Sequence, residues 1–176
     1  RPYVIKEING ARICIVGQAF PRTANANPQE FFPDWSFGLR EDDMIELVQD
    51  IRENEKPDAV VLLSHNGMDV DIKMAERVPG LNAVFGGHTH DGIPKPVKVK
   101  NVEGHTCLVT NAGSNGKYVG VMDFEFADGK LKDLHYKMLP VISDWLPEDK
   151  EMNAYINQMR QTVYDDKIVE SRSSAY

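Results

Sequence analysis

The opening segment of the chain alternates between apolar and polar positions as a β-hairpin does. Residues 3–8 and 11–16 both show this alternation and are separated by Asn9-Gly10. Asn-Gly between two alternating stretches is the strongest short hairpin signal in a sequence. Residues 18–40 then lose all periodicity. A structureless stretch of this length in a compact domain tends to be functional, but a surface loop packed by its own aromatic residues fits equally well: Phe31, Phe32, Trp35 and Phe37.

The middle of the chain reads as a helix, a strand, a second helix and a second strand. Residues 40–55 predict an amphipathic helix that Pro57 ends, because apolar residues recur at helical spacing: Met44, Leu47, Val48 and Ile51. The continuous apolar runs at 59–63 and 81–85 are typical of parallel strands buried on both faces. With a helix over 68–77 between them, they predict one βαβ crossover.

The pattern changes again in the last third of the chain. Residues 97–102 and 105–110 predict one antiparallel hairpin, and residues 118–126 and 130–138 predict another, since each pair flanks a turn that contains glycine. A long helix is expected from Pro147 to about residue 170, with one apolar stripe: Met152, Tyr155, Ile156, Met159 and Val163. The predicted fold class is α/β, with a βαβ unit and antiparallel hairpins in mixed sheets.

Composition narrows the class of protein. The chain has 176 residues, 41% of them hydrophobic, and a net charge of −7, which indicates one globular domain without the basic surface of a nucleic-acid-binding protein. No apolar run approaches the length of a membrane span. Two cysteines exclude a disulfide scaffold. Cys14 and Cys107 both fall in predicted strands and are expected to be buried small hydrophobic residues.

Three histidines follow the two buried strands of the βαβ unit. His65 comes at the end of the first strand, and His88 and His90 come just after the second, behind Gly86-Gly87. Ligands of open α/β sheets bind outside the carboxyl ends of the strands, so the three imidazoles are expected to converge on one crevice. A single histidine at a strand end is usually an ordinary polar residue, but two histidines separated by one residue on a turn favour a metal site.

The residue types do not decide between one metal ion and two. Neutral imidazole suits zinc, iron and manganese. Asn66 and Asp91 are the candidates to hydrogen bond the metal-bound histidines, Asp91 because such histidines commonly donate their second N–H to a carboxylate. Asp69 and Asp71 open a helix, where negative charge is favourable, and are interpreted as helix-dipole residues.

The remaining polar candidates are weaker. His105 lies beside a hairpin turn and His135 lies in a predicted strand, and both are expected to be ordinary surface residues. The glycine-rich loop at 111–116 leads into a strand and not a helix, so it does not match a dinucleotide-binding or P-loop motif. It either approaches the histidines or simply connects two strands.

The histidine-bearing segment resembles a known superfamily. GGHTHD, with SHNG one βαβ unit upstream, is similar to the second half of a calcineurin-like metallophosphoesterase domain, and more narrowly to the 5′-nucleotidase superfamily. Within that superfamily, SHNGMDVDIKMA, VGQAFPRTANANP and TNAGSNGKYVG resemble the periplasmic thiosulfohydrolases of sulfur oxidation. The similarity extends over nearly the whole chain.

This resemblance implies an αββα sandwich with two divalent metal ions, manganese in the thiosulfohydrolases and zinc as the alternative. His65 and His88 match two ligands of one ion, and His90 matches a ligand of the other. The implied reaction is hydrolytic release of sulfate from a thiosulfonate carried on a cysteine of a periplasmic sulfur-carrier protein. The alternative on the same scaffold is a 5′-nucleotidase or cyclic nucleotide phosphodiesterase. A non-catalytic module that binds a partner through residues 18–40 also stays open.

The chain departs from the family pattern in what it lacks. The family's Asp-x-His, Gly-Asp and Gly-Asn-His-Asp/Glu motifs are absent from this sequence, and the resemblance places them upstream of Arg1 together with the catalytic histidine. We therefore expect residues 1–146 to be the C-terminal half of the metallophosphoesterase domain. Residues 147–176 are expected to be a linker helix toward a further, substrate-binding domain.

Overall fold

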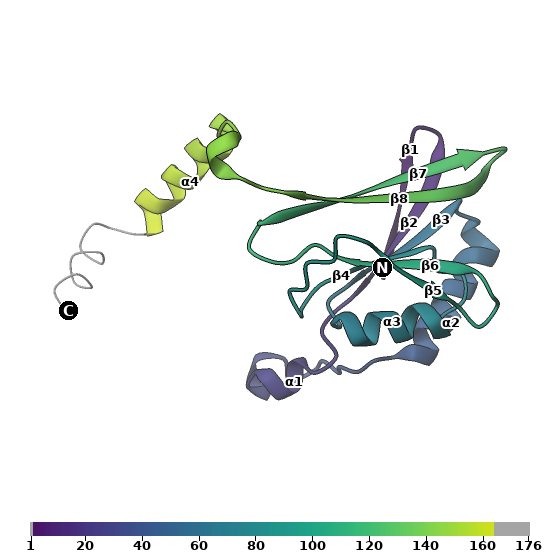
Figure 1. Ribbon diagram of the computed structural model, residues 1–176. Coiled ribbons are helices and arrows are strands. Elements are labelled where there is room, and N and C mark those ends of the chain that lie inside the picture. Colours follow the sequence, from purple (N-terminus) through teal and green to yellow (C-terminus); the bar gives the residue numbers. More distant parts are fainter. Residues whose placement is uncertain (1, 164–176) are drawn as a thin grey trace. The chain divides into compact units, whose positions relative to one another are not determined.

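A computed structural model describes residues 2–163 (Figure 1). A first compact unit ends at Pro140, and a second begins at Val141. The first unit is a mixed α/β structure, as the hydrophobic pattern predicts. Among the described residues, no helix is both long and apolar enough to cross a membrane.

The first unit is built on a six-stranded sheet with the order β1-β2-β3-β4-β6-β5. The four central strands run parallel to one another, and an antiparallel strand closes each edge. Its strands are β1 (Tyr3–Ile8), β2 (Ala11–Gln18), β3 (Ala59–Ser64), β4 (Ala83–Gly86), β5 (Val97–Lys100) and β6 (Thr106–Asn111). The continuous apolar runs thus form central strands, as expected for strands covered on both faces.

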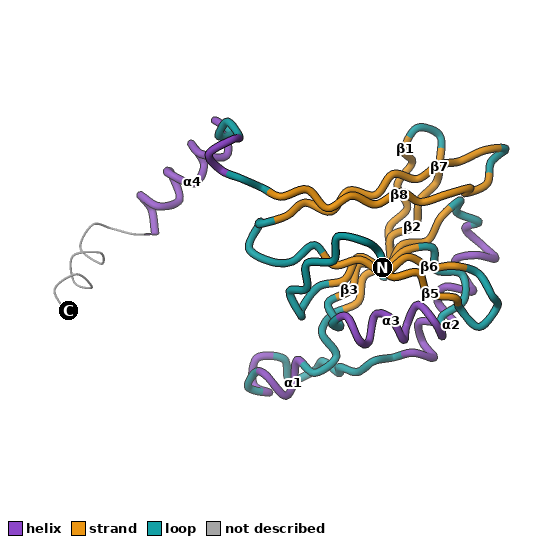
Figure 2. The backbone as a smooth tube through the Cα atoms, viewed as in Figure 1, coloured by secondary structure: helices purple, strands orange, loops and turns teal. Residues whose placement is uncertain are grey.

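Helices cover one face of this sheet and a hairpin covers the other (Figure 2). The helical layer consists of α2 (Glu41–Asp50), its π-helical continuation η2 (Ile51–Glu55), and α3 (Met68–Arg77). The hairpin is a two-stranded antiparallel sheet of β7 (Tyr118–Ala127) and β8 (Lys130–Pro140). The described chain therefore supplies helix, sheet and second-sheet layers of a sandwich.

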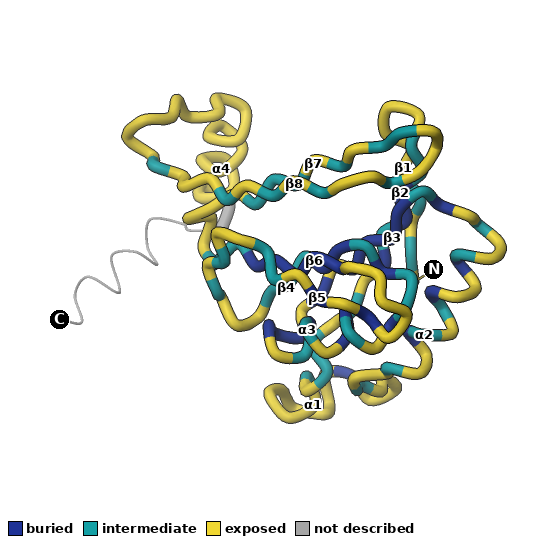
Figure 3. The backbone as a smooth tube through the Cα atoms, turned by 45° about the vertical axis from the view of Figure 1, so that its right-hand side comes forward, coloured by how far each residue is buried: buried dark blue, intermediate teal, exposed yellow. Residues whose placement is uncertain are grey.

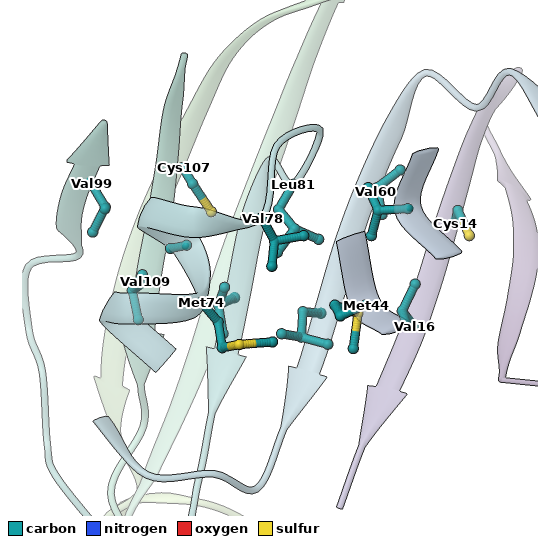
Figure 4. Close-up of a cluster of buried hydrophobic side chains, with 14 of the residues drawn as sticks. Cys14, Val16, Met44, Val60, Met74, Val78, Leu81, Val99, Cys107 and Val109 are labelled. Atoms are coloured by element: carbon teal, nitrogen blue, oxygen red, sulfur yellow. The ribbon is translucent and has the colours of Figure 1, made fainter. Parts of the chain in front are cut away.

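Two apolar clusters hold these layers together. The larger cluster lies between the six-stranded sheet and the helices, where Val16, Val60, Val78 and Val109 have no exposed surface (Figures 3 and 4). The smaller cluster joins Ile13 and Val61 of the sheet to partly buried side chains of the hairpin: Met122, Phe124, Phe126, Leu131 and Leu134. Cys14 and Cys107 are buried free thiols, which confirms their prediction.

Asn82 fixes the amino end of β4. Its Oδ1 accepts the Val60 backbone N–H at 2.8 Å and an Arg52 Nη2 hydrogen at 2.5 Å. Arg52 also donates to the Gly80 carbonyl oxygen. This polar clamp lies at the end of β4 that is opposite the histidines.

The predicted hairpins and the βαβ unit are confirmed, with shifts at some boundaries. β4 begins at Ala83, two residues later than expected, and β6 begins at Thr106. The aperiodic stretch at 18–40 contains two short helical turns, α1 (Thr23–Ala26) and η1 (Gln29–Phe31). Of its aromatic residues, Phe32 is buried, Phe37 is half-buried, and Phe31 and Trp35 are largely exposed.

The second unit contains a 3-10 turn, η3 (Ser143–Trp145), and the helix α4 (Lys150–Val163). The helix begins three residues after Pro147 because Asp149 caps it: Asp149 Oδ1 accepts the Met152 backbone N–H at 2.8 Å. The side chains of the expected stripe from Met152 to Met159 are exposed. The predicted extension to residue 170 and the side chain of Val163 lie outside the described residues.

Candidate functional site

The candidate site lies where the parallel strands end. Register pairs Gln18 with Ser64 and Gly86 with Asn111, and β3 pairs with β4 just before these positions. The carboxyl ends of β2, β3, β4 and β6 therefore meet along one edge of the sheet. This is the edge at which open α/β sheets bind their ligands.

His65 and His88 lie next to each other at this edge. Their ring centroids are 5.1 Å apart and the ring planes meet at 73°. Gly87 makes this approach possible, because a Cβ atom there would lie 3.2 Å from His65 Nδ1 and 3.3 Å from the Ser64 carbonyl oxygen. The structure thus brings together the two histidines that were assigned to one metal ion.

Phe20, which the sequence analysis did not single out, completes an aromatic group with these histidines. Its ring stacks on His88 with centroids 3.9 Å apart, and its edge faces His65 at 6.4 Å. Phe20 follows β2 by two residues, so it reaches the same edge of the sheet as the histidines. Its position directly after a strand, at the start of the 18–40 segment, is the signal that could have identified it.

The turn that carries His88 and His90 has an unusual backbone. Both residues have positive φ angles, 71° and 58°, in the left-handed region that costs a non-glycine residue about 1 kcal/mol or more. Thr89 stabilises the turn through its hydroxyl group. Its Oγ1 accepts a hydrogen bond from the Met68 backbone N–H at 3.3 Å and donates one to Asp91 Oδ2 at 2.5 Å. Such strain concentrates at functional sites because the surrounding structure must maintain it.

The donor chemistry of the three histidines fits a metal ion, but their arrangement is incomplete. All three are exposed, and among residues 2–163 no hydrogen-bond or ion-pair partner is found for their ring nitrogens. His90 makes no ring contact with the described residues, unlike His65 and His88. Within the described part of the chain, no three His, Cys, Asp or Glu side chains are grouped closely enough to hold a metal ion. The chain therefore contributes a pair of imidazoles, and the full ligand set stays a prediction.

Asn66 and Asp91 have other partners than the histidines. Asn66 Nδ2 donates to Gln18 Oε1 at 3.1 Å, and the Asp91 carboxylate accepts the Thr89 hydroxyl. Their predicted hydrogen bonds to metal-bound histidines are untested by this arrangement. The loop at 111–116 does approach the site: Gly113 N–H donates to the Asp91 carbonyl oxygen at 2.8 Å, and Asn111 Nδ2 reaches Thr89 Oγ1 at 3.4 Å.

Asp71 lies in the first turn of α3, as predicted, but its interpretation as a helix-dipole residue misses its burial. Its side chain is fully buried, and burial raises the pKa of its carboxyl group, while hydrogen bonds from Ser64 and Asn66 lower it. The spacing of Met68, Asp71 and Ala75 places Asp71 on the apolar face of α3, and this was the available signal. Asp69, by contrast, is exposed in the first turn as expected.

The other candidates behave as surface residues. The side chain of His105 lies 3.6 Å from Glu103, and that of His135 lies 3.5 Å from Glu125. Both are exposed, as predicted.

A hollow of about 450 Å³ opens beside the histidine pair. Its lining includes Phe20, Arg22, Asn66, Asp69, His88 and Thr89. A larger hollow of about 610 Å³ lies at the opposite ends of the strands, between the β1–β2 and β7–β8 hairpins, and is lined by Ile13 and Phe124 among others. The smaller hollow is the relevant one because it contains His88.

No family model matches the chain, but individual proteins do. The UshA protein of Yersinia enterocolitica is 27% identical, over 80% of this chain and 30% of its own length. The sulfate thiohydrolase SoxB of Thermus thermophilus shares 30% identity with a TM-score of 0.82, over 92% of this chain and 29% of that protein. A 5′-nucleotidase precursor, also of Thermus thermophilus, shares 28% identity with a TM-score of 0.78, over 92% of this chain and 34% of that protein.

These similarities place the chain in the 5′-nucleotidase and calcineurin-like phosphoesterase superfamily. The structure matches the C-terminal part of the 5′-nucleotidase fold, so the fold class and the superfamily predicted from GGHTHD and SHNG are confirmed. The chain spans about 30% of the length of the UshA protein that it matches. Nucleotidases and a thiosulfohydrolase both stand among its similar proteins.

Proposed function

We propose that the full-length protein is a metal-dependent hydrolase of this superfamily, and specifically a thiosulfohydrolase that releases sulfate from a cysteine S-thiosulfonate. The observation that carries the proposal is the pair formed by His65 and His88, whose exposed rings lie 5.1 Å apart at the carboxyl ends of β3 and β4. Two imidazoles without competing hydrogen bonds are suited to bind a divalent ion.

Metal ions would supply the hydrolytic chemistry. The superfamily is generally dinuclear and metal-dependent, and bound divalent ions activate water and neutralise a leaving oxyanion. We assign His65 and His88 to one ion and His90 to the other, with manganese as the leading metal and zinc as the alternative. Residues 1–146 would form the second half of the metallophosphoesterase domain. The remaining ligands and the catalytic histidine would come from the first half of that domain.

The chain's own residues would orient the ligands and shape access. Phe20 covers one face of His88 and restrains the ring. Thr89 holds the turn that carries His88 and His90. The hollow beside His88, with Arg22 on its wall, would accept the negatively charged end of the substrate.

The substrate assignment rests on similarity to SoxB, which is named a sulfate thiohydrolase, over 92% of this chain. The partner would be a carrier protein that presents the thiosulfonated cysteine, in the periplasm. Residues 18–40, with the exposed rings of Phe31 and Trp35, would form a wall of the entry channel. Residues 147–176 would lead toward a further domain.

The second candidate is hydrolysis of nucleotide phosphoesters. It is favoured by the names of other similar proteins, among them the 5′-nucleotidase of Vibrio cholerae. Both substrates present a tetrahedral oxyanion to the metal ions, so the metal centre itself discriminates little. Selectivity must come from the walls around the site, because specificity is a difference in transition-state binding.

The deciding experiment compares kcat/KM of the full-length protein, loaded with Mn²⁺, on two substrates. One is a carrier protein with an S-thiosulfonated cysteine, assayed by sulfate release, and the other is AMP, assayed by phosphate release. Sulfate release that a chelator abolishes, with weak AMP turnover, is the expected result. Efficient AMP turnover without sulfate release would instead favour the nucleotidase.

A further inference from the structure

Asp71 is a fully buried carboxyl group directly beneath the strand ends of the candidate site. Its Oδ1 accepts a short hydrogen bond from the Ser64 hydroxyl and a longer one, 3.4 Å, from Asn66 Nδ2. Its Oδ2 is buried and has no hydrogen-bond partner among the described residues. Ser64 and Asn66 flank His65 in the sequence, so both of these hydrogen bonds restrain the segment that carries that histidine.

The other oxygen of Asp71 faces the strand end that leads to His88. A Cβ atom on Gly86 would lie 2.5 Å from Asp71 Oδ2, closer than real Cβ atoms come, and 3.0 Å from the Thr110 carbonyl oxygen, a tight contact. The Asp71 carboxyl thus occupies the space that a side chain at position 86 would need. Asp71 therefore lies against the ends of both β3 and β4.

Packing alone does not account for this carboxyl group. A buried carboxyl with one unpaired oxygen reduces stability, whereas an apolar side chain of similar volume would increase it. The positions that surround Asp71 on the buried face of α3 are apolar: Met68, Met74 and Ala75. The hydrogen bonds of Asp71 instead extend through Asn66, whose backbone N–H donates to Ser64 Oγ at 3.1 Å and whose Nδ2 reaches Gln18 at the end of β2.

We infer that Asp71 is a positioning residue for the metal ligands: it sets the spacing between the segments Ser64–Asn66 and Gly86–Gly87, so that His65 and His88 bear on the same ion. This inference rests on the proposed function, since it presumes that the two histidines bind metal. Groups that orient metal ligands from outside the ligand set commonly change metal affinity by about 10-fold to 100-fold when they are removed.

The test measures the Mn²⁺ affinity of the full-length protein by competition with a chelator, alongside the midpoint of thermal unfolding without metal. Asp71→Ala should weaken Mn²⁺ binding by about 10-fold or more. Asp71→Asn keeps the shape of the side chain and the Oδ1 acceptor, so it should retain most of the wild-type Mn²⁺ affinity. Ser64→Ala removes only the hydroxyl that donates to Asp71 and serves as the test if Asp71→Ala does not fold. It should weaken Mn²⁺ binding severalfold.

Asn82→Ala is the matched control, because it removes a half-buried polar clamp at the opposite end of β4. It should lower the unfolding temperature and leave Mn²⁺ affinity within about twofold. A folded Asp71→Ala protein with wild-type affinity would overturn the inference alone, as would equal losses in Asp71→Ala and Asn82→Ala. A wild-type protein that binds neither Mn²⁺ nor Zn²⁺ would overturn the proposed function, and this inference with it.

Discussion

The ring of Phe20 stacks on the imidazole of His88, with centroids 3.9 Å apart and planes inclined by 24°. Because such aromatic pairs contribute about 1 kcal/mol beyond their buried area, the contact restrains a histidine that solvent otherwise reaches. Phe20→Ala should therefore weaken Mn²⁺ binding by the full-length protein roughly fivefold. Phe31→Ala is the control in the same segment, since Phe31 is 74% exposed and should be silent. Equal affinities of both variants would contradict a role for the stacked ring.

Replacement of His88 tests the metal assignment itself. His88→Ala should strip metal from the full-length protein and abolish hydrolysis, because it removes one of the two paired imidazoles. Metal content after gel filtration, measured by elemental analysis, gives the answer. The matched variant His105→Ala alters an exposed histidine on a hairpin turn and should keep full metal content. Retention of metal and activity by His88→Ala would show the assignment to be wrong.

The left-handed backbone at His90, with φ of 58°, predicts a separation of stability from function. Glycine adopts this region without steric cost, so His90→Gly should leave the free energy of unfolding unchanged or raise it by up to about 1 kcal/mol. Metal binding should fall nonetheless. Thr89→Gly should lower stability, since Thr89 Oγ1 donates and accepts hydrogen bonds across the turn. Denaturant unfolding of the metal-free His90→Gly and Thr89→Gly proteins measures this difference. A similar loss of unfolding free energy in both variants would refute the strain argument.

The buried carboxyl of Asp71 predicts a pH dependence of stability. Burial raises the pKa of Asp71 above its ordinary value of 3.8, so the folded state holds this proton more tightly than the unfolded state does. The contribution of Asp71 to stability is then present below pH 3.8 and is lost as pH rises through the folded-state pKa. Asp71→Asn does not titrate and should gain stability relative to wild type as the pH rises from 3.8 through the folded-state pKa of Asp71. Urea unfolding of both metal-free proteins across this range checks it, and a constant difference would contradict it.

The two thiols should be inert in the native protein. Burial raises the pKa of Cys107 to about 12, and burial also raises the pKa of Cys14. Since the thiolate is the reactive form, native protein at about pH 8 should resist iodoacetamide, whereas both residues should react in denaturant. Mass spectrometry after timed labelling measures this. Modification of Cys107 in native protein at the rate of a free thiol would mean that the core around β6 opens readily.

The elements that the sequence predicted well are those set by local pattern. Asn9-Gly10 between alternating stretches indicated the first hairpin, and the continuous apolar runs indicated central strands because burial on both faces removes alternation. The position of Phe20 was not predictable in the same way. Its segment has no periodicity, and contacts far away in the sequence fix its path, such as the hydrogen bond from Gln18 Nε2 to the Leu39 carbonyl oxygen at 2.6 Å.

At the site, the sequence pattern predicted where the histidines lie but missed the burial of one carboxylate, Asp71. His65 and His88 follow adjacent strands, so topology alone brings them together. Asp71 satisfied a local rule, acidic residues in the first turn of a helix, while its position on the apolar face pointed to burial. The tertiary environment prevailed over the helix dipole, since the strand ends supply donors from Ser64 and Asn66 that solvent would otherwise provide.

The parallel register of β3 with β4 also bears on how the protein acquires metal during its synthesis. A growing chain that has left the ribosome only as far as His65 does not yet contain the companion imidazole, His88. His88 reaches His65 only after α3 has formed the crossover and β4 has paired with β3. Asn111, which donates to Thr89 Oγ1, is synthesised later still. Parallel pairings between distant segments form slowly, and the ligand pair does not exist before them. The imidazole pair at this edge is thus a product of sheet assembly, and a metal ion bound there would stabilise the assembled sheet.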